Sequence, residues 1–365
     1  MTMTKPIGLY LHIPFCNGKC PYCDFYSVSP ESETVTAYVD ALCKEIDKAD
    51  GIYDSVYFGG GTPSLIGSDN IAKILSHIRR TENCEVTVEC NPSDTGCENS
   101  AFDFSLIAKS GVNRISMGLQ SADNSERKAL GRRGGSDDVE RAIKRAKEAG
   151  IDNISLDLML AIPNQTEESL QKSVEFCKNS GATHISAYIL KIEEGTSFYR
   201  IKDTLSLPDE DETCDLYLKA VSLIEKAGYK QYEISNFALS GYESRHNLKY
   251  WHCEEYLGIG ASAHSFRNGK RFYYERSIDG FINGNPPTGD GFGGDEEEYI
   301  MLALRLCEGL NFDKFKERFG HSVPENIIKK AIELEKHGIV NVSDSAISLT
   351  VNGFLVSNQV IINLL

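Results

Sequence analysis

The chain has 365 residues, of which 53 are acidic and 38 basic, giving a formal net charge of −15. With 25% charged and 41% hydrophobic residues it is not a disordered chain, and its acidity disfavours nucleic acid as a partner. No apolar run approaches the ~20 residues that cross a bilayer, and no apolar stretch at the N-terminus indicates a signal peptide. We therefore expect a cytoplasmic protein that meets membranes only through its partners.

Strand and helix patterns alternate six times through the first 230 residues, at intervals of about 30 residues. Apolar runs and alternation predict strands at residues 8–15, 55–58, 85–90, 114–119, 153–162 and 184–192. A helix is predicted after each strand, at residues 35–49, 70–78, 102–110, 137–149, 167–179 and 210–227. This α/β pattern forms a parallel sheet with helices outside it, either doubly wound or curved into a partial barrel.

The pattern weakens in residues 231–294, which are rich in glycine, asparagine and aromatic residues, and residues 289–294 are predicted to be a flexible linker. In residues 295–365 we predict three helices, two short strands and a final segment, at residues 297–306, 311–319, 324–337, 338–342, 346–351 and 355–362. Three helices before a hairpin are typical of a winged-helix module, and the acidic charge of this one disfavours DNA. We therefore expect three regions, at residues 1–230, 231–294 and 295–365.

Three of the eleven cysteines, Cys16, Cys20 and Cys23, lie within eight residues in a C-x3-C-x2-C pattern. Three thiolates on one tight loop can bind three irons of a [4Fe–4S] cluster and leave the fourth iron open to a small molecule. The main alternative is structural zinc, which requires four ligands; His12 is near, but it lies in a predicted strand and would point poorly. The other cysteines are expected to be buried apolar residues: Cys43, Cys84, Cys90, Cys97, Cys177, Cys214, Cys253 and Cys307.

The residues around these cysteines read YLHIPFC at 10–16 and CPYC at 20–23. This combination resembles the signature of radical S-adenosylmethionine (SAM) enzymes, within them the branch of oxygen-independent coproporphyrinogen III oxidases and their relatives. The resemblance covers nearly the whole chain. It implies a partial (β/α)6 TIM-like barrel followed by a small winged-helix-like α+β module, and a [4Fe–4S] cluster with SAM at its open iron. In parallel barrels the functional residues gather at the C-terminal ends of the strands.

Several motifs fall at such strand ends. GGGTP at residues 59–63 is by itself a turn or a weak phosphate loop, although its glycines let a bound molecule approach the backbone. Glu89 could accept hydrogen bonds from ribose hydroxyls or be a solvated acid, and Asp157 is a single acid in an apolar strand, costly to bury without a partner. The resemblance implies that SAM contacts Tyr10, Tyr22, Gly60, Gly61, Thr62, Glu89, Gln120, Arg132 and Asp157.

Two features depart from the oxidase pattern. Only 15 residues precede Cys16, and Phe25 stands where the oxidases carry a fourth cysteine. The resemblance connects both regions with handling of the porphyrinogen substrate. An oxidoreductase activity like that of coproporphyrinogen dehydrogenase is therefore not expected.

Residues 245–251, RHNLKYW, match an H-N-x-x-Y-W motif. The motif resembles the heme-chaperone (HemW) branch, whose members bind heme and deliver it to respiratory hemoproteins. His246 is then a candidate axial ligand of heme, supported by the aromatic pair that closes the motif. The alternative is a hydrogen-bonded loop histidine beside a packed aromatic pair. His252 and His264 are weaker candidates.

The branch implies a radical SAM-type iron–sulfur protein whose cofactors are a [4Fe–4S] cluster, SAM and heme. Its implied partners are heme, acceptor hemoproteins and an electron donor such as flavodoxin or ferredoxin. Two other functions stay open from the sequence. One is an oxygen-independent coproporphyrinogen III oxidase that makes protoporphyrinogen IX, and the other is a structural zinc protein.

Overall fold

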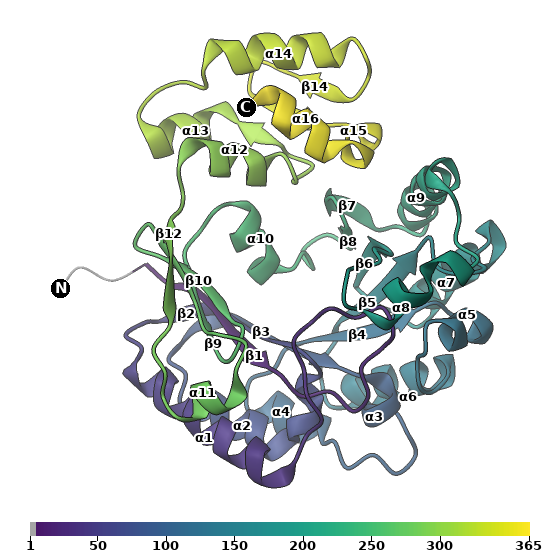
Figure 1. The fold of residues 1–365 in the computed structure, drawn as a ribbon, viewed down its shortest axis with the longest axis vertical. Helices are drawn as coiled ribbons and strands as arrows, with labels where there is room; N and C mark the ends of the chain where they lie inside the picture. The colour runs from purple at the N-terminus through teal and green to yellow at the C-terminus, as the bar shows by residue number, and fades with distance from the viewer. Residues whose placement is uncertain (1–4) are drawn as a thin grey trace.

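The fold is built on one twelve-stranded sheet, which curves into an arc with most helices on its outer side (Figure 1). The structure is a computed structural model and describes residues 5–365. The strand order is β12-β11-β10-β9-β1-β2-β3-β4-β5-β6-β8-β7. The six central strands pair in parallel and in chain order: β1 (Ile7–Ile13), β2 (Tyr53–Gly60), β3 (Arg80–Cys90), β4 (Arg114–Gln120), β5 (Asn153–Leu160) and β6 (His184–Ile189).

The helices that connect these strands lie mainly on the outer face of the arc. They are α1 (Ser32–Lys48), α2 (Ser68–Ser76), α3 (Pro92–Thr95), α4 (Phe104–Lys109), α5 (Asn124–Ala129), α6 (Ser136–Glu148), α7 (Glu167–Asn179), α8 (Ser197–Ile201) and α9 (Glu210–Lys226). The exception is α8, which lies beside the loop that follows β1. The six predicted strand–helix units are all present, and the expected partial-barrel α/β fold is confirmed.

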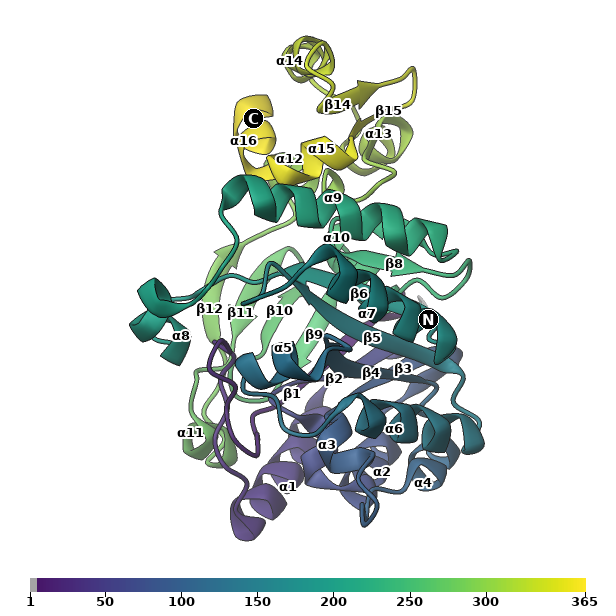
Figure 2. The same cartoon turned by 90° about the vertical axis from the view of Figure 1, so that its right-hand side faces the viewer.

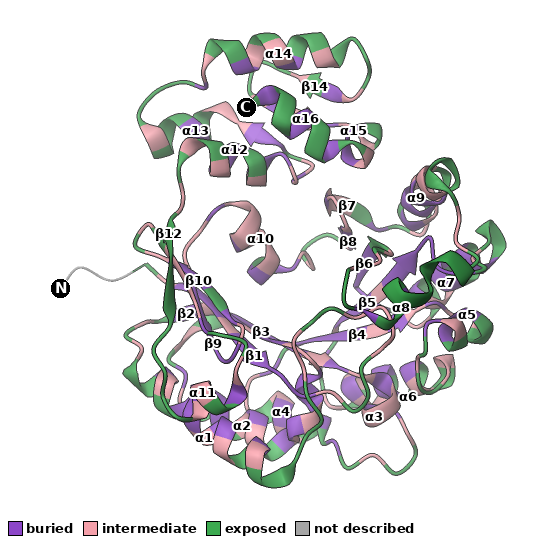
Figure 3. Cartoon of the chain, in the orientation of Figure 1, coloured by how far each residue is buried: buried purple, intermediate pink, exposed green. Residues whose placement is uncertain are grey.

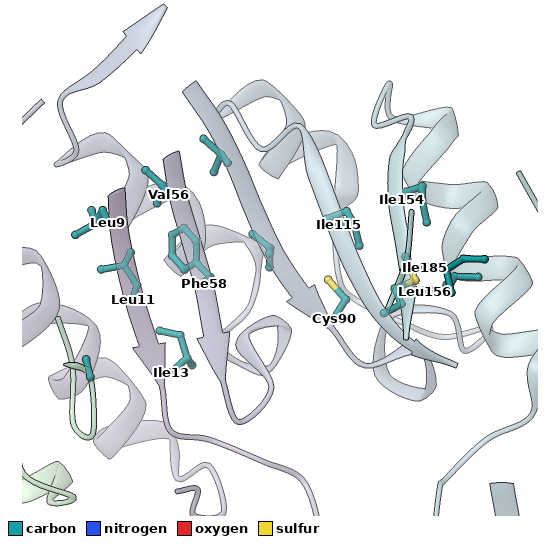
Figure 4. Close-up of a cluster of buried hydrophobic side chains, with 14 of the residues drawn as sticks. Leu9, Leu11, Ile13, Val56, Phe58, Cys90, Ile115, Ile154, Leu156 and Ile185 are labelled. Carbon is teal, nitrogen blue, oxygen red and sulfur yellow. The ribbon is translucent and has the colours of Figure 1, made fainter. Parts of the chain in front are cut away.

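The outer face of the strands is the hydrophobic core. Because strand side chains alternate between two faces, Leu9 and Leu11 of β1, Phe58 of β2 and Ile115 of β4 all point toward the helices, and all four are fully buried (Figure 4). The helix surfaces that face the sheet are buried as well, while their outward surfaces are exposed (Figure 3). Burial of these side chains stabilises the arc by roughly 1.5–3 kcal/mol each.

Residues 231–294 extend the sheet at both edges. Antiparallel β7 (Lys230–Glu233) and β8 (Asn236–Ala238) follow β6, and β9 (Tyr256–Ile259) pairs in parallel with β1. β10 (His264–Arg267), β11 (Lys270–Tyr273) and β12 (Thr288–Phe292) continue the opposite edge, with α11 (Ile278–Ile282) between the last two. The predicted flexible linker at residues 289–294 is therefore wrong. β12 is exposed along its length and pairs with β11 through its backbone. Its sequence, rich in glycine, therefore lacks the alternation of apolar and polar residues that predicts a strand.

The C-terminal residues form a separate small sheet with helices around it. The elements are α12 (Glu296–Ala303), β13 (Leu310–Asn311), α13 (Phe312–Phe319), α14 (Glu325–Glu335), β14 (Val340–Val342), β15 (Ala346–Leu349), α15 (Val351–Leu355) and α16 (Ser357–Leu364). The sheet order is β13-β15-β14. This module lies over α9 and α10 (Arg245–Trp251) at the top of Figure 2, where α15 contacts α9. No helix within residues 5–365 is long and apolar enough to cross a bilayer.

Candidate functional site

The inner face of the arc is polar and partly accessible. The pairing register places its residues in three adjacent tiers: Tyr10, Tyr57, Thr87 and Arg114; then His12, Gly59, Glu89, Ser116 and Ser155; then Gly118, Asp157 and Ser186. Tyr10, Tyr57, Glu89 and Asp157 are all partly exposed, whereas the outer-face residues beside them are fully buried. The inner face is therefore accessible in part, unlike the packed interior of a closed parallel barrel.

Glu89 lies near the middle of this face. It accepts a hydrogen bond of 2.8 Å from the hydroxyl of Tyr57. Burial raises the pKa of Glu89 to about 7; the Tyr57 hydroxyl opposes this rise and the nearby Asp157 adds to it. A carboxyl group with such a pKa is ionised above neutral pH, where it can accept hydrogen bonds from hydroxyl groups.

Asp157 lies one strand beyond Ser116, whose hydroxyl donates to it at 3.4 Å. Burial raises the pKa of Asp157 to about 6, while hydrogen bonding by Ser186 and the charges of Arg114 and Arg132 lower it. Arg114 is 2% exposed, and its Nε has no hydrogen-bond partner. The two carboxyl groups thus share one inner face with a buried cation, which favours their ionised forms.

The cysteine loop leaves the C-terminal end of β1 and returns to it. The backbone N–H of Cys16 donates to the carbonyl of Val28 at 2.9 Å, and the N–H of Val28 donates to Pro14 at 2.8 Å. These bonds close the loop at its base. Cys16, Cys20 and Cys23 are each partly exposed on it.

Residues after two other strands contact this loop. The Thr62 hydroxyl, after β2, lies 3.7 Å from Sγ of Cys16. Arg132, after β4, lies 3.6 Å from Sγ of Cys20 and donates to the carbonyl of Gly118 at 3.1 Å. Arg132 therefore joins the cysteine loop to the end of β4.

Close backbone packing also fixes the loop. A Cβ atom at Gly61 would lie 2.5 Å from the carbonyl oxygen of Phe15, so only glycine fits there. Gly60 has φ +112°, a region that glycine alone adopts easily. Gln120, the last residue of β4, has φ +67°, and such strain in a non-glycine residue is typical of functional sites. On the other side of the loop, Tyr22 packs against Phe198 of α8, with ring centroids 6.2 Å apart.

The three thiols of the loop are suited to the cluster that the resemblance implies, and not to a single metal ion. Within residues 5–365, no three His, Cys, Asp or Glu side chains form a compact group that could hold a single metal ion. In a [4Fe–4S] cluster each thiolate binds a different iron, so its sulfurs stand further apart than the ligands of one zinc. Three partly exposed thiols spread along one loop, beside Thr62 and Arg132, therefore fit a three-ligand cluster.

His246, the candidate heme ligand of the H-N-x-x-Y-W motif, lies in the interior of the protein. It lies on α10, inside the arc near the N-terminal ends of β1 and β2 (Figure 1), and is 1% exposed. Its Nδ1 is hydrogen-bonded to Ser55 at 2.9 Å and its Nε2 to the Tyr250 hydroxyl at 2.8 Å. Burial lowers its pKa to about 3. Both ring nitrogens of His246 therefore have hydrogen-bond partners within the arc, and its assignment as a heme ligand stays a prediction.

The predicted SAM contacts lie toward one end of the arc. Tyr10, Glu89 and Asp157 are on the inner face, and the rest are at or just after the C-terminal strand ends: Tyr22, Gly60, Gly61, Thr62, Gln120 and Arg132. Sequence reasoning missed Tyr57 and Arg114. The alternation of side chains along β2 and β4 could have indicated them, because it places both residues on the same face of the sheet as Tyr10. Among the cysteines expected to be buried, Cys97, Cys214 and Cys307 are partly exposed.

Comparison with known proteins identifies the family. The model of the Radical SAM superfamily matches residues 10–177, and that of the HemN C-terminal domain matches residues 296–356. The chain is 34% identical to the heme chaperone HemW of Bacillus subtilis, over 96% of this chain and 97% of that protein. This chain belongs to the HemW family of radical SAM proteins. It is also 33% identical to HemW of Lactococcus lactis, over 98% of this chain and 97% of the relative.

A solved structure shows the same fold as this HemW family member. The coproporphyrinogen III oxidase HemN of Escherichia coli, described as a radical SAM enzyme, superposes with a TM-score of 0.82 over 98% of this chain and 90% of its own. The two sequences are 18% identical, so the likeness concerns the fold alone. It extends over both the arc and the C-terminal module.

Proposed function

We propose that this protein is a heme chaperone that binds heme and transfers it to acceptor hemoproteins. Cys16, Cys20 and Cys23 would hold a [4Fe–4S] cluster, with SAM at its open iron. The loop of three accessible thiols at the open end of a polar inner face carries the proposal. The relatives' name, heme chaperone, supports heme as the cargo.

The residues of the inner face would position SAM. Glu89 and Asp157 would accept hydrogen bonds from its ribose hydroxyls, and the backbone around Gly60 and Gly61 would approach its amino-acid end. Arg132 would steady the Cys20 thiolate and keep the loop against β4. When bound, the cluster and SAM supply one-electron chemistry, while the protein supplies orientation and shielding from water.

Reduction of the cluster by one electron needs an electron donor, and we propose flavodoxin or ferredoxin for this role. The loop residues Asn17, Gly18 and Lys19 are exposed and give such a donor an approach to the cysteines. We place the protein in the cytoplasm, where it would meet membranes only through membrane-bound acceptors.

One residue of the cysteine loop argues against the alternative function, that of a coproporphyrinogen III oxidase. Phe25 stands two residues after Cys23, where the resemblance places a fourth cysteine in the oxidases, and its side chain is 68% exposed. A thiol at that position is therefore replaced by an apolar ring that faces solvent.

Two incubations of the anaerobic, cluster-reconstituted protein test the proposal. In the first, heme is titrated at the Soret band and the loaded protein is mixed with a heme-free cytochrome b. We expect heme to bind and then to appear in the cytochrome spectrum. In the second, coproporphyrinogen III and SAM are supplied with a reductant, and we expect no protoporphyrinogen IX. Stoichiometric or faster conversion, or failure to bind heme, would overturn the proposal.

A further inference from the structure

The histidines of the chain differ sharply in the partners of their rings. Six of the eight have a hydrogen-bond or ion-pair partner: His12, His77, His184, His246, His252 and His321. Within the described residues only His264 and His337 have none. An iron ligand needs an accessible imidazole nitrogen. In the described part of the chain, His264 and His337 have both nitrogens without a protein partner, whereas His77 and His252 have only Nε2 without one.

His264 lies on the inner face of the arc. β9 pairs in parallel with β1, with Tyr256 opposite Gly8 and therefore on the face of Tyr10. Phe266 of β10 pairs with Tyr256, and His264 is two residues away on the same strand. Because strand side chains alternate with a period of two, His264 faces the same way as Tyr10 and His12.

His264 also lies at the end of the barrel that carries the cysteine loop. β9 runs in the direction of β1, and β10 begins at His264 directly after the turn at residues 260–263. His264 is exposed, and its ring stacks on Tyr273 with centroids 5.2 Å apart and an angle of 24°. This stacking holds the imidazole in place, as a ligand requires. His337 lies after α14 in the C-terminal module, away from the inner face.

Exposed apolar side chains also lie toward this end of the barrel, on the segment that follows β1, at the C-terminal end of β6 and on α8. This apolar rim consists of Phe25, Val28, Tyr188, Ile189, Tyr199 and Ile201, with exposed fractions between 38% and 68%. α8 contacts the cysteine loop, since the N–H of Phe198 donates to the carbonyl of Pro21 at 2.9 Å. Aromatic and apolar side chains are suited to the face of a porphyrin.

An exposed cation completes this end of the barrel. Arg276 follows β11 in the loop beyond Tyr273 and lies near His12. A guanidinium pairs well with a carboxylate, the group that ends each heme propionate. An accessible imidazole, an apolar rim and a free guanidinium therefore lie at one end of the arc.

We propose that His264 is an axial ligand of the heme iron, with the porphyrin seated between His264 and the apolar rim and a propionate near Arg276. This inference rests on the proposed heme-binding function. It places the cargo at the open end of the barrel, near the cysteine loop, and assigns the buried His246 a structural role.

The test is heme titration of the full-length, cluster-reconstituted protein and its His264→Ala variant. We expect the variant to bind heme roughly tenfold more weakly or worse, with loss of the histidine-ligated signature in its visible and electron paramagnetic resonance spectra. Added imidazole should restore that signature. His337→Ala, which removes the other partner-free imidazole, is the matched control and should behave as wild type. Unchanged cluster absorbance in each variant shows that the protein is folded.

The outcomes separate this inference from the proposed function. If the wild type does not bind heme, the heme-chaperone proposal itself fails. If the wild type binds heme and His264→Ala retains both its affinity and its spectrum, the assignment of His264 is wrong while the function stands. A wild-type spectrum of thiolate-ligated heme without histidine would also overturn the assignment.

Discussion

The hydroxyl of Tyr57 donates a hydrogen bond of 2.8 Å to Oε1 of Glu89 at the centre of the inner face. The bond stabilises the carboxylate in a place where burial and Asp157 favour the neutral acid. The balance leaves the pKa of Glu89 at about 7, well above the 4.5 of an ordinary glutamate. The charge of Glu89 therefore changes within the physiological range.

If Glu89 binds the SAM ribose, affinity should depend on this titration. A raised carboxyl pKa means that the ionised, hydrogen-bond-accepting form dominates above about pH 7 and is lost as the pH falls. We expect SAM affinity, measured by calorimetry on the reconstituted protein, to fall from pH 8 to pH 6. Asp157, with a pKa of about 6, adds a second decline at the lower end.

Tyr57→Phe sharpens this test, because it removes only the hydroxyl. Without that donor the pKa of Glu89 should rise further, so the decline in affinity should begin at a higher pH. Glu89→Gln should bind SAM weakly and lose the component near pH 7. An identical pH profile in wild type and Glu89→Gln would rule out Glu89 as the titrating contact.

The cluster assignment predicts which cysteines matter. Cys16→Ala, Cys20→Ala or Cys23→Ala should each abolish the [4Fe–4S] absorbance after anaerobic reconstitution, because only three protein ligands are proposed. Cys177→Ala is the control, since Cys177 is fully buried in α7 and away from the loop. Full iron and sulfide content in Cys20→Ala would refute the assignment.

The strand–helix repeat of the first 230 residues could be predicted because each unit carries its own periodicity. The pairing of β9 with β1 could not, since it joins distant segments and β9 has only four residues. Strand-end motifs located Glu89 and Asp157, and the register of the parallel strands brings both to one face. The motif around His246 gave the residue types of a heme site, but nothing local indicated that α10 packs inside the arc.

The close packing of Gly61 against Phe15 leads to a prediction about the cysteine loop. A methyl group at this position would approach the Phe15 carbonyl to 2.5 Å, and both groups belong to backbone that cannot move without displacing the loop. We expect Gly61→Ala to lower stability by about 1–3 kcal/mol and to reduce cluster occupancy. Gly289→Ala is the control, because a Cβ there meets nothing within 4 Å. Equal thermal stability and iron content in the two variants would contradict this packing.

The buried position of His246 predicts that its replacement affects stability, whereas its motif predicts an effect on heme binding. His246→Ala removes both ring hydrogen bonds and leaves the fully buried Ser55 hydroxyl without this partner. We expect a loss of roughly 2–4 kcal/mol in unfolding free energy, measured by denaturant titration. At temperatures where the variant is folded, its heme spectrum should match wild type. The exposed His337→Ala should change stability by less than about 0.5 kcal/mol. A His246→Ala variant with wild-type stability and a lost heme spectrum would restore His246 as the ligand.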